Sequence, residues 1–246
     1  MVSDTSVGGL FSGADGHRLR PIGEALFGAL ARCAQDGAGV TRDSYGAGET
    51  AAIELLRLFA STHGLASDVD AAGNLWTSLP RQPDGPPIVL GSHIDSVPQG
   101  GNYDGAAGIV AGLLCLVRMS WSRVAPPHPV KVLALRGEES AWFGKCYVGS
   151  SALFGGLTTA DLDRRHRDEE TTLRSRMVDV GADVKRIENG ERLISAVAAY
   201  LELHIEQGPV LVGSGDPMAI VTAIHGNVRW PCAQCTGEDA HSGATP

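Results

Sequence analysis

Apolar residues recur at helical spacing over three stretches of the chain and form short continuous runs over two others. Helical spacing is found over residues 22–34, 51–63 and 104–119, and the continuous runs are residues 88–93 and 130–135. Short apolar runs of this kind are typical of strands that are buried on both faces. The order strand, long helix, strand predicts a βαβ unit, and therefore an α/β fold with a mixed, mainly parallel sheet flanked by helices.

The remaining segments give weaker signals. Residues 68–76 predict a strand and a turn with its bend at 72–74, residues 200–204 predict another strand, and the charged stretch 160–195 has a helical pattern. Residues 1–20 are rich in glycine and predict a loose arm. A glycine-rich hinge at 213–217 precedes a stretch, 218–236, that we expect to form two strands of a different segment.

Composition excludes several classes of function. The 246 residues carry 20 Lys and Arg against 28 Asp and Glu, a net charge of -8, so there is no basic surplus to bind nucleic acid. The longest apolar run, residues 106–117, is too short to span a bilayer, and the first residues do not resemble a signal peptide. The five cysteines are odd in number and have no framework spacing, so we expect a reduced, cytoplasmic protein.

Histidines and carboxylates cluster where the predicted strands end. His93 and Asp95 close the first strand, Asp104 begins the apolar helix, Glu138 and Glu139 follow the second strand, and His204 closes the third. Open α/β sheets keep their functional sites at the carboxyl ends of the strands. Alternate residues of an extended segment share a face, so Asp95 is expected to accept a hydrogen bond from His93, as in metal sites where a carboxylate orients a histidine ligand.

Each cluster also has a simpler structural interpretation. A histidine next to an aspartate is often only hydrogen-bonded, an aspartate before an apolar helix is commonly its N-cap, and paired glutamates commonly face solvent. Their coincidence favours a hydrolytic site with two metal ions, in which one glutamate is a ligand and the other takes a proton from water. Spacing alone leaves both interpretations open.

Four longer motifs resemble a known family. They are residues 91–105 (GSHIDSVPQGGNYDG), 136–144 (RGEESAWFG), 201–211 (LELHIEQGPVL) and 237–246 (GEDAHSGATP). In this order they are similar to the signatures of the N-carbamoyl-L-amino-acid hydrolase and allantoate amidohydrolase branch of the M20 metallopeptidase-like family. The step of 11 residues from His93 to Asp104 favours this branch over the ordinary M20 peptidases.

The resemblance implies two divalent metal ions, either zinc, manganese, cobalt or nickel. His93 and His204 are expected to hold the first metal, Asp104 to bridge both, and Glu139 to bind the second. Metal identity stays open, because histidine and carboxylate ligands suit several divalent ions.

The resemblance also implies the remaining roles and the domain organisation. Glu138 is expected to be the general base, Asp95 to orient His93, Gln207 to lie near the substrate, and His241 to reach the active site of a partner subunit in a homodimer. Residues 1–211 then belong to a zinc-exopeptidase-like catalytic domain, and residues 212–246 begin an inserted α+β lid, or dimerisation, domain. The substrate is an N-carbamoyl-L-amino acid or a ureide such as allantoate.

The family pattern continues past residue 246. Family chains carry a further histidine ligand for the second metal and an arginine that grips the substrate carboxylate, and neither is assigned in residues 1–246. We therefore expect residues 1–246 alone to be inactive or nearly so, as a piece of an active enzyme, as a truncated relative or as one part of a site that another polypeptide completes. An aminoacylase or dipeptidase, and a non-catalytic dimerisation module, are the alternative functions.

Overall fold

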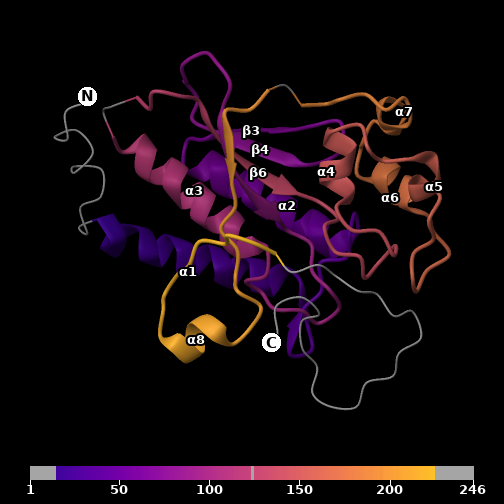
Figure 1. Ribbon diagram of the computed structural model, residues 1–246, viewed down its shortest axis with the longest axis horizontal. Coiled ribbons are helices and arrows are strands. Elements are labelled where there is room, and N and C mark those ends of the chain that lie inside the picture. Colours follow the sequence, from indigo (N-terminus) through magenta and orange to yellow (C-terminus); the bar gives the residue numbers. More distant parts are fainter. Residues whose placement is uncertain (1–14, 123–124, 195, 225–246) are drawn as a thin grey trace. The chain divides into compact units, whose positions relative to one another are not determined.

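The computed structural model describes residues 15–122, 125–194 and 196–224 (Figure 1). The chain divides into two compact units, one that ends at His204 and one that begins at Ile205. None of the described helices is both long enough and apolar enough to cross a membrane.

The first unit is built on a five-stranded mixed sheet with the strand order β3-β4-β6-β5-β7. The neighbours β3–β4 and β4–β6 are antiparallel, whereas β5 pairs in parallel with both β6 and β7. The predicted mixed sheet is confirmed, but it is evenly mixed rather than mainly parallel among the described strands, because the hairpin of β3 and β4 adds two antiparallel pairs. The strands are β3 Ala66–Val69, β4 Leu75–Ser78, β5 Ile88–His93, β6 Val130–Leu135 and β7 Ala199–Leu201.

Alternation along β6 divides the core between the two faces of the sheet. Val130, Val132 and Ala134 pack against the three longest helices, whereas Leu133 packs on the opposite face with Leu153 of a short helix. This is the period of two that a strand imposes on its side chains. The long helices are α1 Gly16–Cys33, α2 Ala47–Thr62 and α3 Ala106–Ser120.

Four short helices and their loops form a second apolar cluster beyond the other face. They are α4 Val148–Leu153, α5 Thr159–Leu162, α6 Leu173–Asp179 and α7 Val184–Glu188. Leu162, Leu173 and Ile187 are buried in this cluster together with Trp142 and Phe143. The charged stretch is therefore helical as expected, but broken into short pieces that bury single apolar residues.

Two predicted strands have the expected bounds, 88–93 and 130–135, and α3 crosses between them as the βαβ unit requires. Other expectations need correction. Helix α1 begins at Gly16, so the end of the supposed loose arm is helical, and residues 1–14 lie outside the described residues. The strand expected at 200–204 is only Ala199–Leu201, because its ladder with β5 ends at Leu201. A two-residue hairpin, β1 Gln35–Asp36 with β2 Gly39–Val40, was not expected.

The second unit is described from Ile205 to residue 224. It contains α8 Val210–Ser214, whose first N–H groups, those of Val210 and Leu211, donate to the Glu206 carboxylate. Residues 218–224 form no strand, and Ile220 is 90% exposed, so the strand expected to begin at residue 218 is wrong for this part. Residues 225–236 lie outside the described residues.

Candidate metal centre

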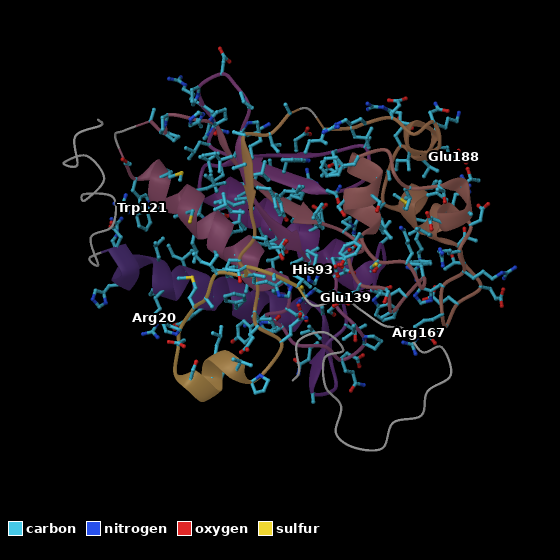
Figure 2. The ribbon with its side chains drawn as sticks, in the orientation of Figure 1. Arg20, His93, Trp121, Glu139, Arg167 and Glu188 are labelled. Carbon is cyan, nitrogen blue, oxygen red and sulfur yellow. The ribbon has the colours of Figure 1, made fainter. Side chains whose placement is uncertain are left out.

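The carboxyl ends of three parallel strands bring the predicted site residues together. His93 is the last residue of β5, Glu138 and Glu139 follow β6, and His204 follows β7. Figure 2 labels His93 and Glu139 at the same end of the sheet, and the donor atoms of these two residues lie within 4.8 Å of each other. The carboxyl ends of parallel strands lie at the same edge of a sheet, and residues 93, 139 and 204 are therefore close together.

His93, Asp104 and His204 form a triangle of possible metal ligands. The two Nε2 atoms are 3.3 Å apart, and Asp104 Oδ1 is 3.6 Å from the Nε2 of His93 and 3.2 Å from that of His204. Atoms bound tetrahedrally to one zinc ion at about 2.0–2.1 Å lie roughly 3.4 Å from one another. Two imidazole nitrogens and one carboxylate oxygen at this spacing fit a single divalent cation.

The other ring nitrogen of His93 contacts Asp95. His93 Nδ1 is 3.1 Å from the main-chain oxygen of Asp95 and 3.4 Å from its carboxylate, and both side chains are buried. When Nδ1 carries the proton, the lone pair of Nε2 is available to bind a metal. Burial alone lowers the pKa of His93, but the carboxylates of Asp104 and Asp95 outweigh it and raise that pKa well above its usual value.

Asp95 has a second set of contacts that the sequence did not predict. Its carboxylate accepts hydrogen bonds of 2.9 Å from the backbone N–H groups of Glu138 and Glu139, and another of 2.9 Å from the Ser44 hydroxyl. Burial raises the pKa of Asp95, but its bonds to His93 and to these N–H groups outweigh burial and lower that pKa below its usual value. The carboxylate is therefore ionised. Asp95 thus fixes the glutamate pair as well as the histidine.

Glu138 and Glu139 make a second possible ligand group with His93. Burial raises the pKa of Glu139 to about 7, with His93 opposing the shift and Asp95 adding to it. Burial also raises the pKa of Glu138, with the same two neighbours acting in the same directions. A carboxylate with a raised pKa is a stronger base at neutral pH, which suits a residue that takes a proton from water. Both glutamates are half-buried, so the pair is not a fully solvated face.

Two glycines allow α3 to begin against this site. Gly105 has φ +62°, and a Cβ there would collide with the carbonyl oxygen of His93 and lie 2.6 Å from its ring. A Cβ at Gly108 would collide with the Leu203 carbonyl oxygen. The N-cap of α3 is Gly105, with no side-chain hydrogen bond, so the simple interpretation of Asp104 as a capping residue does not hold.

Two residues singled out from the sequence lie outside the first unit as described. Gln207 belongs to the second unit, where it has φ +59°. His241 lies outside the described residues. Their assignments remain predictions.

Sequence reasoning missed several residues that support the site. Arg42 and Glu49 are fully buried and polar. The Ser92 hydroxyl donates to Glu202 at 2.7 Å, which joins β5 to the segment that leads to His204. Arg42 and Glu49 lie outside the four motifs. Ser92 lies within the first motif and Glu202 within the third, but the motifs gave these two residues no role.

The fold and the site together define an α/β protein with a candidate metal centre at the carboxyl edge of its sheet. Residues 89–242 match peptidase family M20/M25/M40, and the chain belongs to this family. The resemblance read from the four motifs is confirmed.

Named relatives refine the position within the family. The chain is 39% identical over 213 residues to an N-carbamoyl-L-amino acid amidohydrolase of Geobacillus stearothermophilus, covering 86% of this chain and 52% of the relative. It is 34% identical over 187 residues to an allantoate amidohydrolase of Bacillus subtilis, covering 75% and 44%. The crystal structure of a hydantoinase/carbamoylase family amidase from Burkholderia ambifaria matches with a TM-score of 0.66 and 31% identity, over 78% of this chain and 47% of that one. The chain thus spans about half the length of these relatives.

Proposed function

We propose that the protein takes part in the metal-dependent hydrolysis of a C–N bond that is not a peptide bond. The observation that carries this is the triangle of His93, Asp104 and His204 with Glu138 and Glu139 beside it. The names of the relatives, which include N-carbamoyl-L-amino acid and allantoate amidohydrolases, support the substrate class. The proposed substrate is accordingly an N-carbamoyl-L-amino acid or a ureide such as allantoate.

Two divalent cations are proposed to complete the site. His93, His204 and Asp104 would hold the first, and Asp104 with Glu139 would hold the second. When bound, such ions polarise a carbonyl oxygen and make water a stronger nucleophile at neutral pH. Zinc, manganese, cobalt and nickel all suit these donors.

Glu138 is the proposed general base. It accepts the proton of the attacking water as the oxygen bonds to the carbonyl carbon, and then gives that proton to the nitrogen as the C–N bond breaks. General acid–base catalysis of this kind contributes typically about 10²–10⁴ in rate. Asp95 keeps the backbone of Glu138 in place through the 2.9 Å bond to its N–H group.

The proposed assembly is a homodimer in the cytoplasm. In it the segment 212–246 begins the lid and dimerisation domain, His241 enters the site of a partner subunit, and Gln207 lies near the substrate. Native mass spectrometry tests this assembly through the number of subunits.

The deciding experiment measures metal content and turnover together. Native mass spectrometry of the purified chain with added zinc or manganese should show bound metal, and Glu138→Gln should keep that metal while losing any turnover of N-carbamoyl-L-amino acids or allantoate. A wild-type chain that binds no metal at micromolar concentrations would overturn the metal-dependent function.

The same assay separates the alternatives. Faster hydrolysis of N-acetylated amino acids or dipeptides than of N-carbamoyl compounds would indicate an aminoacylase or dipeptidase. Dimer formation with neither bound metal nor turnover, unchanged by Glu138→Gln, would indicate a non-catalytic module. The matched control is Glu54→Gln, an exposed glutamate of α2 that pairs with Arg57.

A further inference from the structure

Arg42 is a buried arginine whose hydrogen bonds are concentrated on one loop. Its relative exposure is 0%, although arginine is rarely buried completely without a charged partner. Within the described part of the chain, its guanidinium hydrogen bonds all end on neutral oxygens, at Ile94 and Asn102. The loop that contains these acceptors connects β5 to α3 and is bounded by His93 and Asp104.

The guanidinium joins the two ends of this loop. Arg42 Nε donates 2.6 Å to the carbonyl oxygen of Ile94, the residue directly after His93. Nη1 and Nη2 donate to the side-chain and main-chain oxygens of Asn102 at 3.2 and 3.4 Å, two residues before Asp104. One rigid planar group therefore sets the separation between the segments that carry two of the proposed metal ligands.

Other bonds fix Arg42 and Asn102 in turn. The backbone N–H of Arg42 donates to the Ser96 hydroxyl at 3.0 Å, and its carbonyl oxygen accepts from the Ser96 N–H at 3.0 Å. Asn102 Nδ2 donates 3.0 Å to the carbonyl oxygen of Phe27 in α1. The loop is thus held from both sides of the guanidinium, and little freedom remains for the Asp104 end.

The charge of Arg42 also interacts with carboxylates of the site. Burial lowers the pKa of Arg42, and the carboxylates of Asp95 and Asp104 are among the charges that oppose this shift. A cation that lies near these two carboxylates favours their ionised forms, which are the forms that accept N–H groups and bind metals.

We infer that Arg42 is a positioning residue for the metal centre, which sets the distance between His93 and Asp104 through Ile94 and Asn102. This inference rests on the proposed function in one respect, because it requires these ligands to bind a metal. Residues behind metal ligands typically change metal affinity about 10–100-fold when they are substituted. Lysine keeps the charge but lacks the fork, so it cannot hold both ends of the loop.

The experiment is a competition titration of the full chain with Zn²⁺ and Mn²⁺ against a fluorescent chelator. Arg42→Lys should weaken binding of the tightest metal about 10-fold or more. Asn102→Ala removes the side-chain bonds to Arg42 and Phe27 but keeps the Arg42 bonds to the main-chain oxygens of Ile94 and residue 102. It should therefore weaken binding in the same direction but by less, and it tests the inference independently if the lysine variant does not fold. In the double variant the two losses of metal affinity should be less than additive, because both substitutions break the same bond between Arg42 and Asn102.

Leu56→Ala is the matched control. Leu56 is fully buried in the core between the sheet and the long helices, so its loss lowers the melting temperature without touching the loop. If Arg42→Lys and Asn102→Ala weaken metal binding no more than Leu56→Ala at a similar melting temperature, Arg42 is only a structural residue and the inference is overturned. A wild-type chain that binds no metal overturns the proposed function itself, and the two failures are therefore distinguishable.

Discussion

The carboxylate of Asp95 accepts the backbone N–H of Glu139 at 2.9 Å, across a separation of 44 residues in the chain. The same carboxylate accepts the N–H of Glu138 and lies 3.4 Å from Nδ1 of His93. One buried charge therefore connects the end of β5 with the loop after β6. If Asp95 served only to orient His93, the contact with Nδ1 would be sufficient, and the two bonds from backbone N–H groups would not be needed.

Asp95→Asn should accordingly disturb more than the orientation of His93. The amide keeps the size but has one accepting oxygen instead of two, so at least one backbone N–H loses its partner and the charge beside the imidazole disappears. We expect metal affinity to fall about 10–100-fold and the free energy of unfolding to fall by about 1–3 kcal/mol. Chelator competition and urea unfolding measure the two effects.

Ser44→Ala provides the comparison for this variant. It removes the Ser44 hydroxyl bond to the same carboxylate but keeps the charge and both bonds donated by backbone N–H groups. It should cost roughly 0.5–1.5 kcal/mol of stability and leave metal affinity nearly unchanged. Equal losses of affinity in the two variants would contradict the special role of the Asp95 charge.

The two ligand groups should differ in affinity. The first offers three donor atoms 3.2–3.6 Å apart, whereas the second is proposed to share Asp104 with the first and depends on Glu139, whose pKa burial raises to about 7. His204→Ala should therefore abolish the tight metal, and Glu139→Gln should remove only a weaker one. Native mass spectrometry at stepwise zinc concentrations counts both, and loss of the tight metal in Glu139→Gln would contradict this assignment.

The sequence predicted the parts of the fold that local pattern determines. Continuous apolar runs identified β5 and β6 with their bounds, and the βαβ order placed His93 and Glu139 at one edge of the sheet. By contrast, the hairpin of β3 and β4 adds two antiparallel pairs to the sheet, and the apolar pattern of a single strand does not specify its neighbours.

The candidate site shows the same division. The ligand types were visible because histidines and carboxylates stand out at strand ends, and the motif resemblance gave them roles. The supporting contacts of Arg42, Ser44 and Glu202 were not visible, because each joins segments 50 or more residues apart through hydrogen bonds. Such pairs carry no periodicity in a single sequence.

Gly105→Ala should damage the metal site more than its backbone conformation alone explains. Gly105 has φ +62°, and its Cβ would meet both the carbonyl oxygen and the ring of His93. Gly64 is a matched position, with φ +68° and nothing within 4 Å of its Cβ. Gly64→Ala should cost about 1–2 kcal/mol of stability with unchanged metal binding, since only the left-handed conformation is penalised.

The difference between the two alanine variants then isolates the close approach to His93. We expect Gly105→Ala to be the less stable of the two in thermal unfolding and to bind zinc at least about 10-fold more weakly than Gly64→Ala. Equal zinc affinities would show that α3 can move away from His93 without disturbing Nε2.

Glu49 should make the stability of the metal-free protein depend on pH. Its carboxylate is fully buried, accepts 2.6 Å from Arg136 Nε, and accepts the N–H groups of Tyr45 and Gly137 at 2.7 and 2.8 Å. Burial raises the pKa of Glu49 to about 7, although Arg136 opposes the shift. Between the unfolded value, near 4.5, and about 7, folding therefore takes up a proton.

The sign of the effect follows from that uptake. The contribution of Glu49 to stability is fully present below pH about 4.5 and is lost as the pH rises through about 7, at most about 3 kcal/mol for a shift of this size. Urea unfolding with a chelator at pH 5 and pH 8 measures it, and Glu49→Gln removes the titrating group. The wild type should lose more stability than Glu49→Gln between the two pH values. If it gains stability relative to that variant, the attraction of Arg136 outweighs burial, and Glu49 is ionised throughout this range.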